Sequence, residues 1–89
     1  MDLNHLTHLR VRATQRAEQY QRIIEEASRL LHEAQEILLN FPDPYHPPAS
    51  HLLWQIEASF EVLVDALLGL WAEEMEDRER EQQIWAHLE

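Results

Sequence analysis

The chain contains no cysteine and no lysine, and it has only one glycine among its 89 residues. Without cysteine it can form neither a disulfide scaffold nor a thiolate zinc site, and it has no thiol nucleophile. One glycine and four prolines are too few turn residues for most all-β or α/β folds, which need a turn about every ten residues. These absences favour a single small all-α domain.

Positive charge is also scarce, because seven arginines face seventeen acidic residues and the formal net charge is −10. Binding to nucleic-acid phosphates or to an anionic membrane surface needs a cationic surface, so neither partner is expected. The most apolar stretch, residues 52–72, contains Glu57, Glu61 and Asp65, which a membrane-spanning helix would not carry. No basic segment followed by an apolar core marks a signal peptide near Met1, so we expect a cytoplasmic protein.

Residues 3–41 contain neither glycine nor proline, and their apolar residues recur at alternating steps of three and four. This heptad spacing predicts a first helix over about 3–40 with one apolar seam. Ile23, Leu30 and Ile37 widen the apolar stripe on one side of that seam. The predicted seam consists of Ala17, Tyr20, Ile24, Ala27, Leu31, Ala34, Leu38 and Phe41.

Four prolines between Pro42 and Pro48 cannot continue an α-helix, so they predict a stiff loop over 41–49. A second helix is predicted over about 50–80, with Ser50 as its N-cap. Its heptad seam is predicted to pack on the first helix, which gives an antiparallel two-helix hairpin. That seam consists of Leu53, Ile56, Phe60, Leu63, Leu67 and Leu70.

The second helix carries more apolar surface than one neighbour can cover. A second stripe runs along it beside the seam, and a helix that is apolar over most of its circumference should be buried on more than one side. We therefore expect a second partner, and a four-helix bundle completed by dimerisation or by docking on another protein. The predicted partner-binding residues are Trp54, Val64, Leu68, Trp71, Met75 and Trp85. Gly69, between Leu68 and Leu70, predicts either a close helix crossing or a bend.

Beyond residue 73 the apolar seam fails, because Glu74, Asp77 and Glu81 occupy its positions. The sequence predicts that the second helix runs past the hairpin into solvent and ends in an acidic tail, in which Trp85 folds back or anchors a partner. Net charge follows this division, at −1 over residues 1–40 and −9 over 41–89. The predicted acidic surface consists of Glu57, Glu61, Asp65, Glu73, Glu74, Glu76 and Asp77.

Residue patterns for catalysis or metal binding are missing. Six histidines occur, of which His5 and His8 are the closest pair, yet neither the His-Glu-x-x-His nor the Glu-x-x-His spacing is present. There is no glycine-rich phosphate loop and no nucleophile elbow, and acid pairs such as Glu57 and Glu61 have no partner residues for acid–base work. We expect no enzyme activity, no cofactor and no metal.

The chain resembles the small E-type co-chaperones of type III secretion needle subunits, over roughly residues 6–70. The resemblance rests on the Leu6-Thr7-His8-Leu9 start, the Asp43-Pro44-Tyr45 turn and the Leu52-Leu53-Trp54-Gln55-Ile56-Glu57 segment. Trp54, Trp71 and the residues from Glu73 onward depart from the pattern. Membership would imply a cytoplasmic complex that keeps a self-polymerising needle subunit monomeric, with the apolar stripe of the second helix against a helical-repeat chaperone.

Three functions are compatible with the sequence. The first is a non-enzymatic adaptor or co-chaperone that docks through the second helix. The second is a small acidic inhibitor, such as a phage anti-defence or immunity protein, that blocks a basic surface of its target, for example one that binds nucleic acid. The third is a self-assembling homodimer that forms a four-helix bundle. All three place the binding surface on residues 52–85.

Overall fold

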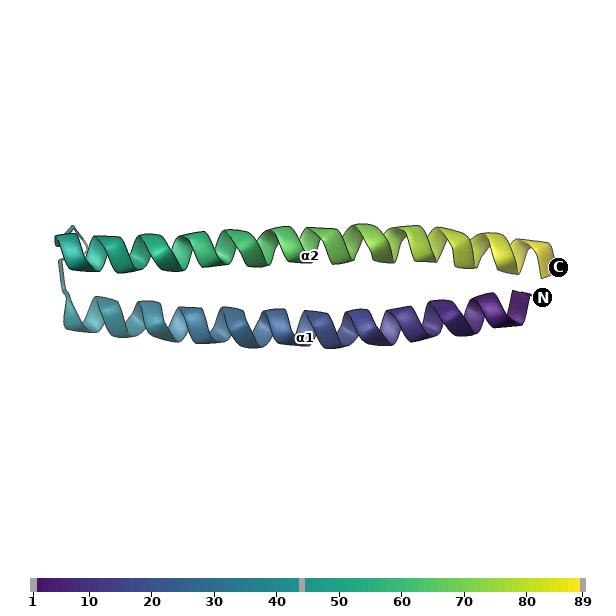
Figure 1. Ribbon diagram of the computed structural model, residues 1–89, viewed down its shortest axis with the longest axis horizontal. Coiled ribbons are helices and arrows are strands. Elements are labelled where there is room, and N and C mark those ends of the chain that lie inside the picture. The colour runs from purple at the N-terminus through teal and green to yellow at the C-terminus, as the bar shows by residue number, and fades with distance from the viewer. Residues whose placement is uncertain (1, 44, 89) are drawn as a thin grey trace.

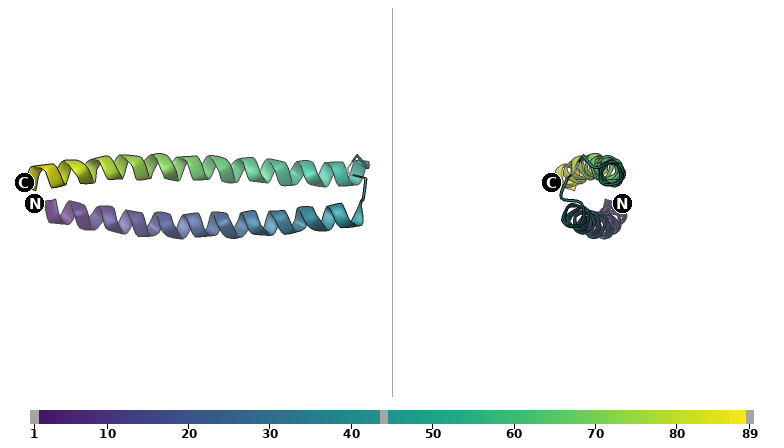
Figure 2. Two further views of the ribbon diagram at one scale, coloured as in Figure 1. Left: turned by 180° about the vertical axis from the view of Figure 1, so that it is seen from behind. Right: turned by 90° about the vertical axis from the view of Figure 1, so that its left-hand side faces the viewer.

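The computed structural model describes residues 2–43 and 45–88, and the side chain of Asp2 is left out of that description. Two long helices, α1 (Asp2–Asn40) and α2 (Pro47–Leu88), run antiparallel over their whole length (Figure 1). The predicted all-α two-helix hairpin is therefore confirmed. The molecule measures 64 × 15 × 14 Å, and the end-on view shows two helices side by side with no third layer (Figure 2).

The loop end is closed by Asp43 and His46. The Asp43 Oδ1 atom accepts a hydrogen bond from the backbone N–H of Tyr45 at 3.0 Å, and the Asp43 carbonyl accepts one from the N–H of His46 at 3.1 Å. The rings of Phe41 and His46 stack, with centroids 5.6 Å apart. These contacts turn the chain between the helices; Pro44 lies outside the described residues.

The second helix begins close to its predicted start at about residue 50, but the N-cap predicted for it is wrong. α2 begins at Pro47, and the N–H of Ser50 donates to the carbonyl of His46 at 2.9 Å, so Ser50 lies within the first turn and does not cap it. Prolines fit the first turn of a helix because the N–H groups there have no acceptor within the helix. The prolines at 47 and 48 therefore open α2 and do not delay it.

At half of its positions, the seam predicted for the first helix differs by one residue from the seam that packs on α2. Leu30 is 2% exposed, whereas the neighbouring Leu31 is 58% exposed and Ile24 is 57% exposed. Ile23 and Ile37 are half-buried, but Ala17 and Leu38 are exposed. Both sets of residues have heptad spacing, so periodicity alone cannot choose between them; contact with α2 decides. The core on this side of the hairpin is formed by Phe41, which follows α1, and on α1 by Leu6, Leu9, Arg16, Tyr20, Ile23, Ala27, Leu30, Ala34 and Ile37.

The predicted solvated tail does not form. α2 is continuous to Leu88, its heptad interface includes the half-buried Glu74, Glu81 and Ile84, and Asp77 is 3% exposed. The helix stays on α1 because the charged layer has opposite charges facing it, as described below. Glu89, at the end of the predicted tail, lies outside the described residues.

Gly69 marks no close crossing between α1 and α2. It is exposed, and a Cβ atom built on it would meet nothing within 4 Å. Among the residues that the structure describes, none has a positive φ angle. Gly69 is thus an ordinary exposed position of α2.

Candidate interaction surface

The two flanks of the hairpin can be told apart from the heptad positions. Because the helices are antiparallel, the residue that follows a core position on α1 and the residue that follows one on α2 lie on the same flank. Arg10 and Arg78 occupy such positions, and both border one hollow between the helices. Arg12 and Glu73 lie on the opposite flank, where their side chains meet at 3.1 Å.

The first flank is apolar on both helices. On α1, Ile24, Leu31 and Leu38 each follow a buried or half-buried core residue and are exposed. On α2, Val64 and Trp71 occupy the corresponding positions, and Leu68 and Met75 lie beside them one further step around the helix. We call this surface the apolar face; it consists of Ile24, Leu31, Leu38, Val64, Leu68, Trp71 and Met75.

The opposite flank is mainly polar. Gln19, Glu26 and Glu33 of α1 face Ser59 and Ala66 of α2 along it. The Arg29 guanidinium bonds the carboxylates of both Glu26 and Glu33 on the surface of α1. The hydrogen bond from Arg29 is the main cause of the lowered pKa of Glu26. This flank is a solvated surface, so the exposed apolar residues are concentrated on one side of the hairpin.

Four of the six predicted partner-binding residues lie on the apolar face, and the other two flank it. Val64, Leu68, Trp71 and Met75 are brought together, but Trp54 lies toward the loop and Trp85 toward the open end. The Trp54 ring stacks on His51 at a centroid distance of 6.4 Å, and the Trp85 Nε1 atom donates to Glu81 at 3.4 Å. The prediction missed the share of α1, because Ile24, Leu31 and Leu38 were assigned to the seam.

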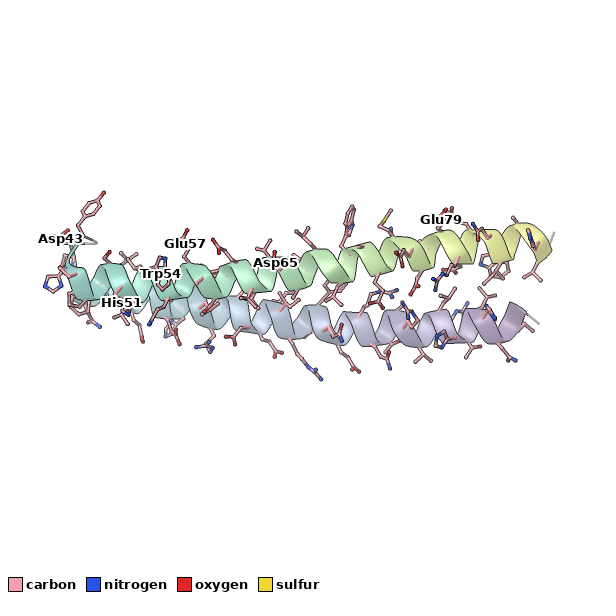
Figure 3. The ribbon with its side chains drawn as sticks, turned by 45° about the horizontal axis from the view of Figure 1, so that its top comes forward. Asp43, His51, Trp54, Glu57, Asp65 and Glu79 are labelled. Carbon is pink, nitrogen blue, oxygen red and sulfur yellow. The ribbon has the colours of Figure 1, made fainter. Side chains whose placement is uncertain are left out.

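The predicted acidic surface divides into two parts. Glu57, Glu61 and Asp65 are exposed along α2; Figure 3 shows Glu57 and Asp65 on this helix between His51 and Glu79. Glu57 and Glu61, with Phe60 and Val64, border a shallow hollow beside the apolar face. Glu76 is exposed and Glu74 is half-buried, bonded to Arg78 at 3.3 Å. The remaining two residues, Glu73 and Asp77, belong to a different site.

Asp77 and Glu73 form an ion-pair cluster with two arginines of α1. The Asp77 Oδ2 atom accepts hydrogen bonds from Arg16 Nη1 at 2.6 Å and from Arg12 Nε at 2.8 Å. The Glu73 Oε1 atom lies 3.1 Å from both guanidinium groups. The placement of Asp77 on an exposed acidic surface is therefore wrong, and Glu73 is only half-exposed. Arg16 and Asp77 are charges of opposite sign at heptad core positions of the two helices, and this is the signal that could have revealed the pair.

The cluster shifts the ionisation of its members. Desolvation disfavours the charged form of Asp77, but the hydrogen bonds and charges of Arg12 and Arg16 outweigh it and lower the pKa of the carboxyl. For Arg16, desolvation is likewise outweighed by the bonds to Asp77 and Glu73, and its pKa is raised. Asp77 Oδ1 accepts no hydrogen bond, although Arg80 Nη1 lies 3.9 Å from it. The cluster holds α2 on α1 where apolar seam residues are missing.

A third group of polar residues lies at the open end of the hairpin. His5, His8 and His87 border a hollow with Leu9, Arg80 and Ile84. Within residues 2–43 and 45–88, no group of three or more histidine, cysteine or acidic side chains has the geometry to hold a metal ion. The hollow therefore supplies no argument for a metal centre.

The hairpin exposes more surface than its mass requires. Its accessible surface is 7118 Å² for a mass of 10.6 kDa, whereas a compact monomer of that mass exposes about 5,500 Å². The excess of about 1,600 Å² is comparable with the total area of a standard protein–protein interface. The radius of gyration, 19.8 Å, likewise exceeds the value of about 12 Å for a compact domain of this length.

No helix in the described part of the chain is both long and apolar enough to cross a membrane. Comparison of the sequence with protein-family models, with curated proteins and with solved structures gives no match.

Proposed function

We propose that this chain is a non-enzymatic protein-interaction module that binds helical segments of protein through the apolar face. The observation that supports it is the one-sided distribution of exposed apolar residues over both helices, with Ile24 and Leu31 from α1 beside Val64 and Trp71 from α2. Burying such a surface is favourable by about 25 cal/mol per Å² of apolar area. Large contiguous apolar patches of this kind mark interaction sites.

The geometry favours a helix, or a pair of helices, as the ligand. The apolar face follows the shallow groove between the two antiparallel helices, and its residues recur at heptad spacing on both helices. A third or fourth helix that lies along this trough inserts its own side chains between these residues, as in a four-helix bundle. This proposal includes an adaptor or co-chaperone role. It also includes membership of the E-type co-chaperones that the sequence resembles.

An acidic inhibitor is less well supported, because the acidic run predicted for it is partly internal. Asp77 and Glu73 form ion pairs with Arg12 and Arg16, so they do not contribute to a continuous acidic strip that faces solvent. The acids that remain, Glu57, Glu61 and Asp65, lie beside the apolar face. We therefore assign them the role of a polar rim to the interface.

A photoreactive phenylalanine analogue placed at Leu68 tests this function directly. In cells that express the full chain, irradiation should yield covalent protein adducts from position 68. The matched control is the same analogue at Val62, which is exposed on α2 but lies on the other flank. Equal adduct formation from both positions, or none from position 68, would refute the assignment of the apolar face as an interaction surface.

A further inference from the structure

The charges at the two ends of the apolar face are opposite in sign and symmetrically placed. Glu57 and Arg78 occupy equivalent heptad positions on α2, and both are exposed. They lie about 16 Å on either side of Leu68, at 1.5 Å per residue. In a two-fold symmetric interface, when one residue contacts a second residue of the other copy, that second residue contacts the first residue of the other copy in the same way. This pattern therefore suits a two-fold axis that passes near Leu68.

The α1 half of the face has its centre at the same level. The ion pair between Arg16 and Asp77 fixes how the two helices are aligned. Ile24 lies eight residues after Arg16 on α1 and Leu68 lies nine residues before Asp77 on α2, which is about 12 Å and about 13.5 Å from that pair at 1.5 Å per residue. A single axis perpendicular to the helices can therefore pass through the centre of both halves.

We propose that the occupant of the apolar face is a second copy of this chain, packed face to face with the two hairpins antiparallel. This rests on the proposed function of the face and names its partner. α1 lies on α1 of the partner copy and α2 on α2, which completes a four-helix bundle with all neighbouring helices antiparallel. Ile24 meets its own equivalent at the axis, and Val64 meets Trp71 of the other copy.

The charged residues favour this arrangement over the other possible dimer, in which the two-fold axis is parallel to the helices. In the antiparallel dimer, Glu57 of each copy lies opposite Arg78 of the other, so two opposite-charge contacts form at the rim. The alternative axis, parallel to the helices, lays α1 on α2 of the other copy with the open ends together. Arg10 and Arg78 border one hollow near the open end, together with Glu74, Asp77 and Glu81, so that arrangement brings this same cluster of both copies to one end and forms no contact between Glu57 and Arg78.

The elongated shape leaves enough surface, polar and apolar together, for a stable dimer to bury. The excess of about 1,600 Å² per chain over a compact monomer exceeds the roughly 800 Å² that each partner contributes to a standard interface. The single seam between α1 and α2 is a small core for a chain of 89 residues. The second layer of apolar contacts adds the burial that an isolated hairpin lacks.

Single cysteines test the arrangement without ambiguity, because the chain contains none of its own. A disulfide needs Cα atoms within about 7 Å of each other. Ile24→Cys lies at the axis and should form a covalent dimer on mild oxidation. Leu31→Cys has the same exposure, but its two copies are separated by about 20 Å along the helix direction, and it should stay monomeric in non-reducing electrophoresis.

Charge reversal tests the rim contacts on the full chain by sedimentation equilibrium. The unmodified chain should sediment with the mass of two chains. E57R and R78E should each weaken dimerisation about tenfold, because each creates two like-charge contacts per dimer. The double variant E57R/R78E should restore the original dissociation constant, since the contacts are then again of opposite charge. Circular dichroism of each variant confirms that the helices form.

A monomeric unmodified chain overturns the proposal. Equal cross-linking at positions 24 and 31, or no rescue in the double variant, overturns the antiparallel arrangement. The proposed function fails separately: a monomeric chain that still forms adducts from position 68 but not from 62 keeps an interaction surface whose partner is a different protein.

Discussion

Arg16 of α1 and Asp77 of α2 form an ion pair at 2.6 Å with both side chains almost removed from solvent, at 5% and 3% exposure for the two residues. The pair occupies heptad core positions near the open end, where the sequence offers few apolar residues. Burying two charges is costly, and the attraction between them repays this only with good geometry and further hydrogen bonds. Arg12 and Glu73 supply those further contacts.

Removing one partner of this pair should destabilise the hairpin strongly. In Asp77→Ala the Arg16 guanidinium stays buried and keeps only Glu73, so we expect a loss of about 3 kcal/mol in the free energy of unfolding. The double variant R16L/D77L replaces both charges by apolar side chains and should be close to neutral or more stable. Urea unfolding followed by circular dichroism measures both. Similar losses in the single and the double variant would contradict the account.

Stability should fall in acid because of the same carboxyl. The pKa of Asp77 is lowered in the folded chain, so its contribution is complete above the unfolded value of about 3.9 and is lost as the pH falls through the folded pKa. In this range the unfolded chain binds more protons than the folded one. The measurement is the difference in unfolding free energy between the original chain and Asp77→Asn, which should be constant near neutral pH and shrink below about pH 4. A difference that does not vary down to pH 2 would show that Asp77 titrates normally.

The position of the core seam is tested by two leucines of α1. Leu30 is buried against α2, so Leu30→Ala should cost about 2–4 kcal/mol of stability. Leu39 is exposed on the outside of α1 and is not part of the apolar face, so Leu39→Ala should change stability by less than about 0.5 kcal/mol. Thermal and urea unfolding of the two variants side by side gives both values. Equal costs would place the seam elsewhere.

The glycine within α2 should be replaceable with a gain. A Cβ atom at Gly69 meets nothing within 4 Å, and alanine is the better helix former by about 1 kcal/mol. We expect Gly69→Ala to raise the free energy of unfolding by about 0.5–1 kcal/mol and to leave the association state unchanged. A loss of stability would reveal a close neighbour at this position, such as a partner helix that crosses there.

Sequence reasoning reached the hairpin because its signals are strong and local. Heptad spacing, the absence of helix breakers from residues 3–41 and the prolines at 42–48 all agree. It could not choose between Leu30 and Leu31 as core, since adjacent heptad positions give the same period and only the second helix distinguishes them. For the same reason the sequence places the binding surface on residues 52–85 alone, although Ile24, Leu31 and Leu38 of α1 supply three of the seven residues of the apolar face.

The end of the second helix was misjudged for a different physical reason. A charged residue at a core position normally means exposure, and Glu74, Asp77 and Glu81 were interpreted in that way. Asp77 is instead compensated by Arg12 and Arg16, which lie more than sixty residues earlier in the chain. Such long-range pairing depends on how the two helices are aligned along their length. The heptad spacing of apolar residues within each helix does not reveal that alignment.

Two valines of α2 provide the most direct test of the apolar face as the interaction surface. Val64 is 50% exposed on that face, and Val62 is 67% exposed on the other flank, so aspartate should be tolerated equally well by the isolated hairpin at either position. In sedimentation velocity of the purified chains, Val62→Asp should sediment as the dimer formed by the unmodified chain, whereas Val64→Asp should sediment as a helical monomer. If Val64→Asp also sediments as the dimer, the apolar face is not the surface through which this protein associates.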